Sequence, residues 1–494
     1  MSAAAAYATL APVTDRRDPS PAVDGGPDRG LTADELLAVT GGTLLARSDR
    51  PILGGAVDSR EVGPGNLFVA LPGERTDGHR FVGAALAAGA AGVLVARPPD
   101  GVDVADVDAT IVRVDDPLRA LQAVATAWRA RFDPLVVGIT GSIAKTSTKE
   151  AVATVLGAAM PTLRNEGNLN NEIGLPLTVL RLRSQHRAAV LEMGMYVGGE
   201  IRDLAAIGRP EIGIVTAVQP VHLSRIGTIE AVERAKGELV EALPDDGVAI
   251  LNADDERVRR MAARTRARVR TYGFATDADV RADDVASRGA DGMSFRLLAD
   301  GAALAVTIPT LGRLAVHNAL AAAAAGLAAG LSPDAIGAAL ATGWSAPHRG
   351  QLVRAGGITI VDDSYNASPA SVAAALELLA GLDGRRIAVL GEMLELGAEH
   401  GSGHRATGEA AAAVVDRLVV VGDGASAIAD GALAAGMPLP SVVRVPDREA
   451  AREHLIGTLQ PGDVVLVKAS RGIALDLLVD ELAAALGSGE AARP

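Results

Sequence analysis

The segment GITGSIAKTST, residues 138–148, directly follows an apolar run and precedes a helical stretch. A glycine-containing turn that leads into a helix presents backbone N–H groups and the positive end of the helix dipole to a phosphate. Lys145 adds a cation, and Thr146 adds a hydroxyl for a phosphate-bound Mg²⁺. The pattern predicts a nucleotide phosphate-binding loop, with an ordinary capped helix as the alternative. The loop residues predicted to contact the nucleotide are Gly138, Gly141, Ser142, Ala144, Lys145, Thr146 and Ser147.

The loop departs from the standard GxxxxGK[ST] pattern in two places. Ile139 stands six residues before Lys145, and Ala144 occupies the position just before the lysine, where the pattern has glycine. If the backbone at Ala144 needs a positive φ, alanine costs about 1–2 kcal/mol there. If the position needs only a close approach to the phosphate, one methyl group is tolerated.

Four further polar residues follow apolar runs or lie in nearby helical stretches. Glu192 ends the run AAVLE, and a carboxylate opposite a phosphate loop suits Mg²⁺. His222, Lys236 and Asp363 come later in the chain. Each of the four also has an ordinary structural interpretation: a solvated strand-end charge, a structural histidine, an exposed helical lysine and a helix N-cap. Their order along the chain carries more information than any one of them.

The elements that position these residues are short Val/Ile/Leu runs separated by helical stretches. Continuous apolar runs are typical of buried parallel strands, and their alternation with helices predicts a doubly wound α/β sheet. Ligands of such sheets bind beyond the carboxyl ends of the strands, which is where the polar residues stand. The runs lie at residues 135–140, 188–194, 212–218 and 247–255, and in a second block at 358–363, 386–393, 417–424 and 463–470.

This pattern predicts three domains after an N-terminal extension. Residues 1–30 are rich in Ala, Pro, Gly and Asp, lack a signal-peptide pattern and are predicted to be disordered. Regular structure is expected to begin with a capping box formed by Thr32 and Glu35. The expected domains are a small α/β domain at 31–114, a central P-loop-type doubly wound domain at 115–347 and a C-terminal Rossmann-like domain at 348–494.

Composition excludes several classes of function. The 494 residues carry a net charge of −13, and aromatic residues make up only 2%. Both values argue against nucleic acid as a partner. The most apolar stretch, residues 319–331, is shorter than the ~18 residues that a membrane span needs. The chain has 0 Cys, which excludes disulfides, thiolate metal sites and cysteine nucleophiles, and agrees with a cytoplasmic location.

The sequence motifs, and the order in which they occur, resemble those of the Mur ligase family, the ATP-dependent amide-forming enzymes of peptidoglycan precursor synthesis. They span residues 58–471. The resemblance implies one domain for a UDP-sugar, one for ATP and one that closes over the amine substrate. The motifs are TGSIAKTS (140–147), NEGNLNNEIGLPLTVL (165–180), LEMG (191–194), PVHL (220–223), AKGE (235–238), LNADD (251–255), GRLAVHNALAA (312–322) and DDSYNASP (362–369).

The resemblance also implies roles for individual residues. Lys145, Lys236, His222 and Arg349 would be catalytic, and Lys236 matches the family's carbamylated lysine. Thr146, Glu192, His222 and Lys236 would hold Mg²⁺, with two ions expected. Asn318 would contact adenine, Asp363 the ribose and Arg349 the phosphates of ATP. The residues expected to contact the other substrates are Asp58, Ser59, Arg60, Asn170, Asn171, Asn366, Lys468 and Ser470.

Within the family, three features point to the members that join D-alanyl-D-alanine to UDP-N-acetylmuramoyl-tripeptide through an acyl phosphate. They are DSR at 58–60 followed by PGNLFVALPGERTDGH, the Tyr365–Asn366 pair, and LGEMLELG, in which Glu392 replaces the usual Asp. The resemblance implies a protein that acts as a monomer.

The sequence also departs from the family pattern, at Ala144, Leu314, Ala315, His348 and Ala469. Two alternatives therefore stay open. One is a Mur-type or folylpolyglutamate-type ligase with another acceptor, and the other is a weakly active nucleotide-binding relative.

Overall fold

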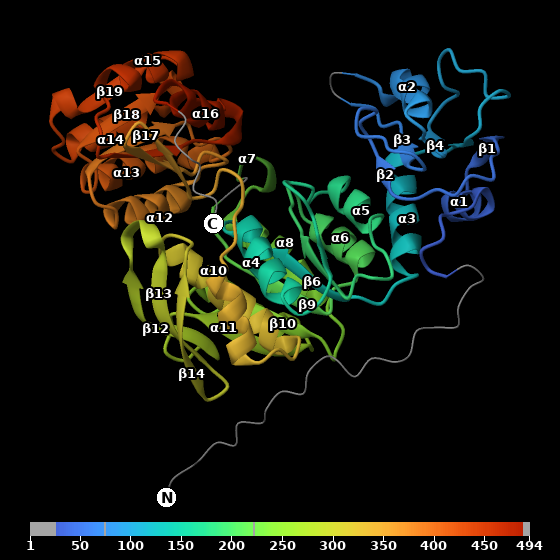
Figure 1. Ribbon diagram of the computed structural model, residues 1–494, viewed down its shortest axis with the longest axis horizontal. Helices are drawn as coiled ribbons and strands as arrows, with labels where there is room; N and C mark the ends of the chain where they lie inside the picture. Colours follow the sequence, from blue (N-terminus) through green and yellow to red (C-terminus); the bar gives the residue numbers. More distant parts are fainter. Residues whose placement is uncertain (1–25, 74–75, 221–222, 488–494) are drawn as a thin grey trace, which may run out of the picture.

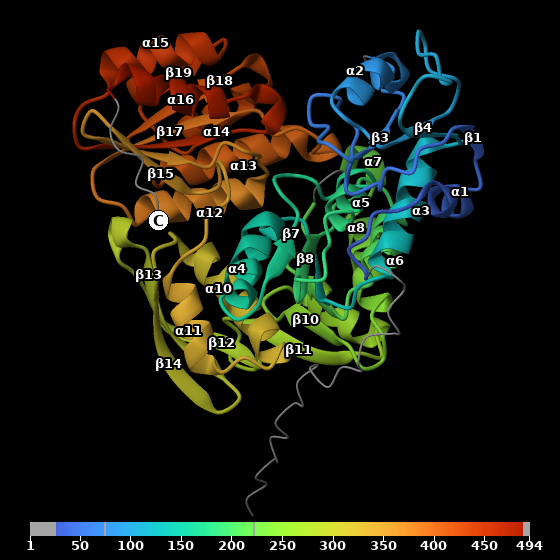
Figure 2. The same cartoon turned by 45° about the vertical axis from the view of Figure 1, so that its right-hand side comes forward.

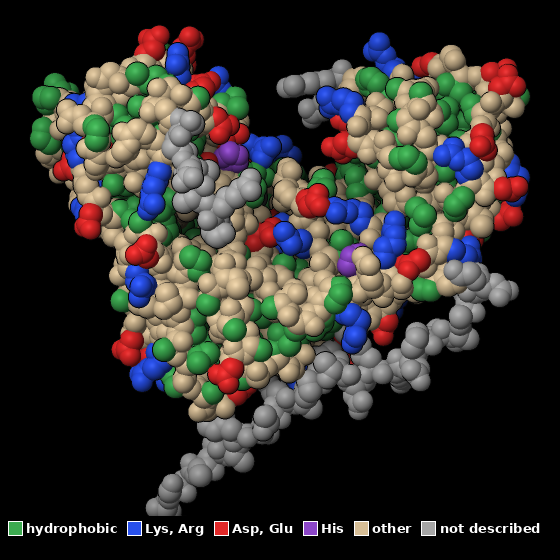
Figure 3. Space-filling view, in the orientation of Figure 1, with side chains coloured by type: hydrophobic (Ala, Val, Ile, Leu, Met, Phe, Trp, Pro, Cys, Tyr) green, Lys and Arg blue, Asp and Glu red, His purple; other side chains and the backbone are tan. Residues whose placement is uncertain are grey.

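The computed structural model describes residues 26–73, 76–220 and 223–487. Three sheets organise this part of the chain. Figures 1 and 2 show the lobes of the N-terminal and C-terminal sheets on the same side of the central sheet. In Figure 3 the surface is hollowed between these two lobes. The fold class expected from the sequence, a three-domain α/β protein, is confirmed.

The N-terminal sheet has 5 strands in the order β1-β5-β4-β3-β2, and only β1 runs antiparallel to its neighbour. The capping box is present, because Thr32 Oγ1 accepts from the Glu35 backbone and Glu35 accepts from the Thr32 backbone. The strands are β1 (Thr43–Ala46), β2 (Gly55–Ala56), β3 (Leu67–Val69), β4 (Gly92–Val95) and β5 (Thr110–Arg113). The helices are α1 (Ala33–Thr40), α2 (Val82–Ala87) and α3 (Pro117–Arg129).

Most of the predicted disordered extension, residues 1–25, lies outside the described residues. Residues 26–30 contact the folded part of the chain. Arg131 donates to the Arg29 carbonyl over 3.0 Å, and the Ser184 backbone donates to Asp28 over 2.7 Å. Helix α3 then links two lobes, because Trp128 is buried and its indole N–H donates to the Leu182 carbonyl.

The central sheet has 9 strands in the order β14-β13-β12-β11-β10-β9-β6-β8-β7. All four apolar runs predicted for this region form parallel strands. Two antiparallel strands that the sequence did not predict, β13 and β14, extend one edge. The strands are β6 (Leu135–Thr140), β7 (Thr162–Arg164), β8 (Ala188–Glu192), β9 (Ile212–Val215), β10 (Val248–Asn252), β11 (Arg268–Gly273), β12 (Val280–Ser287), β13 (Met293–Ala299) and β14 (Ala302–Ile308).

An alanine-rich helix fills the core beside this sheet. Residues 319–325 of α10 are all buried, so its small side chains allow α4 and the sheet to pack closely around it. Within the described ranges, no helix has both the length and the apolarity that crossing a bilayer requires. The central helices are α4 (Lys145–Gly157), α5 (Gly174–Val179), α6 (Glu200–Gly208), α7 (Leu223–Ile226), α8 (Ile229–Glu241), α9 (Glu256–Arg260), α10 (Arg313–Ala328) and α11 (Pro333–Ala341).

The C-terminal sheet has 6 strands in the order β15-β16-β20-β17-β18-β19, parallel except for β15. Its strands are β15 (Gln351–Ala355), β16 (Ile358–Asp362), β17 (Arg385–Gly391), β18 (Arg417–Val421), β19 (Val442–Val445) and β20 (Asp463–Lys468). Its helices are α12 (Pro369–Ala380), α13 (His400–Ala412), α14 (Ser426–Ala434), α15 (Arg448–Thr458) and α16 (Asp476–Ala485).

Candidate active site

A cleft of about 450 Å³ lies between the central and C-terminal lobes, at the carboxyl ends of β6, β8, β16 and β20. It brings together most of the residues that the sequence singled out, although they are spread over more than 300 positions of the chain. Those that line it are Ser142, Ala144, Lys145, Thr146, Ser147, Asn170, Asn171, Glu192, Lys236, Asn318, Arg349, Asp363, Asn366, Lys468 and Ser470.

The phosphate loop connects β6 to the start of α4. Lys145 Nζ donates to the carbonyls of Gly141, over 2.7 Å, and Ser142, over 3.4 Å. Burial lowers the pKa of Lys145; the Glu192 carboxylate opposes this shift and the Arg349 charge adds to it. The influence of Arg349 places a cation of the C-terminal lobe close to the loop.

The backbone at Ala144 has φ 65° and ψ 0°, in the left-handed region. The loop therefore does need a positive φ at this position, and the alanine costs about 1–2 kcal/mol relative to a residue without backbone strain. His348, which stands where the family has glycine before the arginine, also has a positive φ, of 57°. Its ring is held by a 2.7 Å contact between Nδ1 and the Asp362 carboxylate.

Glu192 and Lys236 are buried charged residues on the central wall of the cleft. Asn170 Nδ2 donates to Glu192 Oε1 over 2.7 Å, whereas the buried Glu192 Oε2 has no hydrogen-bond partner among the described residues. An unsatisfied buried carboxylate oxygen is expensive unless a ligand meets it. Glu192 therefore has a free oxygen available for a cation.

Lys236 lies in α8 and is 2% exposed. Burial, together with the nearby Lys145 charge, lowers its pKa well below the usual range. No residue in the described part of the chain pairs with its ammonium. Both effects make the neutral, nucleophilic form of the amine easier to reach than in an exposed lysine.

The described residues include no group of three His, Asp or Glu side chains that could hold a metal. Mg²⁺ commonly uses one or two carboxylates together with substrate phosphates, so Glu192, the Thr146 hydroxyl and a bound triphosphate suit it. His222, the other predicted ligand, lies outside the described residues.

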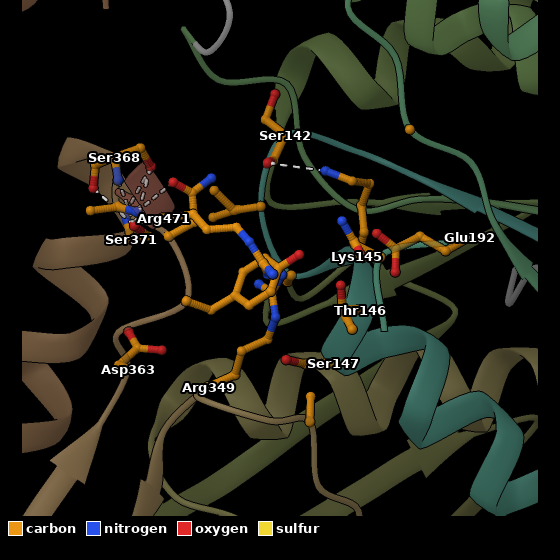
Figure 4. Close-up of a pocket in the computed structure, with 18 of the residues that line it drawn as sticks. Ser142, Lys145, Thr146, Ser147, Glu192, Arg349, Asp363, Ser368, Ser371 and Arg471 are labelled. Carbon is orange, nitrogen blue, oxygen red and sulfur yellow. Dashed lines mark hydrogen bonds between the residues drawn. The ribbon is translucent and has the colours of Figure 1, made fainter. Parts of the chain in front are cut away.

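The C-terminal wall carries three cations. Lys468 Nζ donates to the Asp363 carboxylate over 2.6 Å and to the Asn366 carbonyl over 2.8 Å. Arg349 and Arg471 both stack on the ring of Tyr365, at 4.1 and 4.9 Å from its centroid. Figure 4 shows the two arginine side chains reaching toward the same part of the cleft, opposite Lys145 and Glu192.

Sequence reasoning missed Tyr365 and Arg471 as site residues. Both stand in motifs already recognised, Tyr365 in DDSYNASP and Arg471 directly after Ser470. The available signal was that an arginine and an aromatic ring both follow strand ends.

Some predicted residues do not line the cleft. Gly138 lies inside β6, where a Cβ would come within 2.9 Å of Leu239. Gly141 is the first residue of the loop, and a Cβ there would clash with the Thr216 hydroxyl at 1.8 Å. Both glycines therefore permit close packing. Asp58 and Arg60 form an exposed ion pair in the N-terminal lobe, with Ser59 between them.

Comparisons with known proteins agree with this geometry. Residues 139–326 match the Mur ligase middle domain, 348–471 the "Mur ligase, glutamate ligase domain" and 53–129 the "Mur ligase family, catalytic domain". The UDP-N-acetylmuramoyl-tripeptide--D-alanyl-D-alanine ligase of Mycobacterium bovis is 38% identical, over 92% of this chain and 98% of that protein.

Two solved structures are similar along most of their length. MurF from Acinetobacter baumannii superposes with a TM-score of 0.82 at 30% identity, covering 93% of this chain and 100% of that one. MurF ligase from Thermotoga maritima in complex with ADP has a TM-score of 0.77 at 28% identity, covering 88% and 98%. The chain belongs to the Mur ligase family.

Proposed function

We propose that this chain joins D-alanyl-D-alanine to UDP-N-acetylmuramoyl-tripeptide at the expense of ATP, in peptidoglycan precursor synthesis. The observation that carries the proposal is the cleft, in which the phosphate loop faces the C-terminal cations across a small volume. The Mycobacterium bovis relative supports the choice of substrates by its name, and the ADP complex of the Thermotoga maritima protein supports the use of ATP.

The reaction transfers the γ-phosphoryl group of ATP to the substrate carboxylate, which gives an acyl phosphate and ADP. The amine of the dipeptide then attacks the acyl carbon, and the tetrahedral intermediate collapses to the amide and phosphate, with loss of the amine proton. Two anions must approach each other in the first step, so the main task is to neutralise and align charge. Lys145 from the loop and Arg349 from the opposite wall both line the cleft and can neutralise these anions.

The walls of the cleft fit a metal. Thr146, the free oxygen of Glu192 and His222 would hold Mg²⁺, with two ions expected, and a carbamylated Lys236 would supply a further oxygen. The metal would screen the charges of the triphosphate and the carboxylate. Carbamylation would join the neutral Lys236 amine to CO₂ with release of a proton, converting a buried amine into an anion.

The other roles follow from position. Asn318 lines the cleft with Oδ1 accepting from Thr148, so its Nδ2 remains as a donor for adenine. Asp363 would contact the ribose. Asn170, Asn171, Asn366, Lys468 and Ser470 would face the substrates, and Asp58, Ser59 and Arg60 would contact the UDP-sugar.

The proposal extends to the whole chain. Its domains are 31–114, 115–347 and 348–494, and each of the three sheets falls within one of these ranges. The protein acts as a monomer, which is supported by a cleft lined from a single chain. It works in the cytoplasm, where ATP and UDP-sugars are available.

The test is ligation by the purified chain with ATP, Mg²⁺, UDP-N-acetylmuramoyl-tripeptide and D-alanyl-D-alanine. We expect one phosphate released per amide formed and no product when any component is omitted. A parallel assay with L-glutamate as acceptor addresses the folylpolyglutamate-type alternative. Product with glutamate but not with the dipeptide would replace the proposed acceptor. ADP binding without any turnover would favour the weakly active relative.

Carbamylation has its own test. In ¹³C-bicarbonate the wild type should give one carbamate carbon resonance, and Lys236→Met should lack it. Lys149 serves as an internal control. It is also buried, but its ammonium is paired with Glu150 and the Asn165 carbonyl, so it should give no carbamate resonance. A resonance that survives in Lys236→Met would show that the carbamate lies elsewhere.

A further inference from the structure

Two arginines on the C-terminal wall have no protein partner for their N–H groups within the described part of the chain. Arg349 and Arg471 come from segments more than a hundred residues apart, yet both stack on the one ring of Tyr365. Both line the cleft. Stacking uses the flat face of a guanidinium and leaves its five N–H donors free at the edge. The arrangement therefore presents two sets of anion-binding donors, held by one aromatic ring.

Several other polar groups on this wall already have partners. Lys468 is paired with Asp363. The Ser368 and Ser371 hydroxyls bond to each other in the capping box of α12. Ser470 Oγ accepts from the Leu394 backbone over 2.9 Å. Among the described residues, Arg349 and Arg471 are thus the two cations on this wall that can bind a ligand.

The effect of Arg349 on Lys145 distinguishes the two arginines. The charge of Arg349 lowers the pKa of Lys145, so its guanidinium lies near the loop that is proposed to bind the phosphates of ATP. Arg471 follows β20, and its guanidinium carbon lies 4.9 Å from the centroid of the Tyr365 ring. The chemistry that Arg471 favours is a carboxylate, which a guanidinium binds through two parallel hydrogen bonds.

Resting on the proposed function, we infer that Arg471 binds the terminal carboxylate of the amine substrate and that Tyr365 is the positioning residue that holds it. A dipeptide carries its carboxylate and its amine at opposite ends, about 7 Å apart when extended. A carboxylate anchored at Arg471 directs the amine toward the acyl phosphate, which Arg349 and Lys145 neutralise.

The experiment compares D-alanyl-D-alanine with D-alanyl-D-alaninamide, which lacks the carboxylate, in the wild type and in Arg471→Gln. The wild type should prefer the dipeptide in kcat/KM by roughly ten- to hundredfold, the value of a lost charge-assisted pair. In Arg471→Gln this preference should collapse to about one, through a higher KM for the dipeptide. The KM values for ATP and the UDP-substrate should stay within about threefold, and Arg471→Lys should restore part of the preference.

Tyr365 has a matched pair of variants. Tyr365→Phe keeps the ring and should retain the preference, whereas Tyr365→Leu should weaken it and also raise the KM for ATP through Arg349. A preference that persists in Arg471→Gln overturns the inference. So does a folded Arg471→Gln that loses turnover equally with both acceptors. If the wild type ligates neither acceptor, the proposed function itself fails, and the two failures are thereby distinguished.

Discussion

At the scale of single residues, the cleft contains strain that the family pattern avoids. Ala144 lines the cleft and His348 directly precedes Arg349 of the opposite wall, and both have a positive φ where the family has glycine. Non-glycine residues persist in this region only when the surrounding structure holds them there. The Thr148 backbone N–H donates to the Ala144 carbonyl over 2.8 Å, which ties Ala144 to the first turn of α4. The helix start thus holds the backbone of Ala144 in this conformation.

This strain predicts that Ala144→Gly stabilises the protein. Glycine removes a cost of about 1–2 kcal/mol, and the extra freedom of the unfolded chain returns about 0.4–1 kcal/mol of it. Calorimetry should therefore show a free energy of unfolding that rises by up to about 1.5 kcal/mol, with the rate of ATP turnover unchanged or higher. Ala158→Gly is the matched control, since Ala158 ends the same helix at φ −67° and should only lose stability. Equal losses in both variants would contradict the strain argument.

At the scale of elements, one carboxylate ties the start of α1 to the segment that directly follows α3. Glu35 caps its own helix by accepting from the Thr32 backbone over 2.9 Å. It also accepts from Arg29 over 2.6 Å and from Arg131 over 2.7 Å. Burial opposes ionisation, but the Arg29, Thr32 and Arg131 interactions outweigh it and lower the pKa of Glu35 to about 2.

Glu35→Gln should loosen α1 in a way that depends on pH. A lowered pKa means that the ionised group stabilises the fold fully above its unfolded value, and that this contribution is lost as the pH falls toward about 2. Near neutral pH we expect amide exchange in residues 33–40 to accelerate by an amount equal to about 1–3 kcal/mol. The difference from the wild type should shrink with acidification. Asp34→Asn is the control, because its pair with Arg47 is exposed and contributes little.

The elements also show which parts of the structure the sequence could predict. Parallel strands such as β6 and β20 are continuous apolar runs because both faces are buried, and they were recognised. Strands β12 to β14 alternate buried and exposed positions, so they gave no such run and were missed. Strand-end residues such as Glu192 were predictable for the same reason as the strands. The stacking of Arg349 and Arg471 on Tyr365 was not, because it depends on how two distant loops meet.

At the scale of the whole molecule, an acidic protein binds anionic substrates. The net charge is −13, while Lys145, Arg349, Lys468 and Arg471 gather in one cleft. The overall field therefore repels the substrates at long range, and the local cations attract them at short range. Salt screens exposed charges beyond about 10 Å at 0.1 M but affects partly buried groups much less.

This division of charge predicts an unusual dependence on salt. Raising the ionic strength from about 0.05 to about 0.5 M should leave kcat/KM for the UDP-substrate unchanged or raise it by up to about threefold, because it mainly removes the long-range repulsion. Steady-state assays in sodium chloride and in potassium acetate separate screening from competition by chloride. A tenfold fall in both salts would show that exposed basic groups, rather than the cleft, govern the encounter. A fall in chloride alone would indicate competition at the cleft cations, and the acetate series would then give the dependence due to screening.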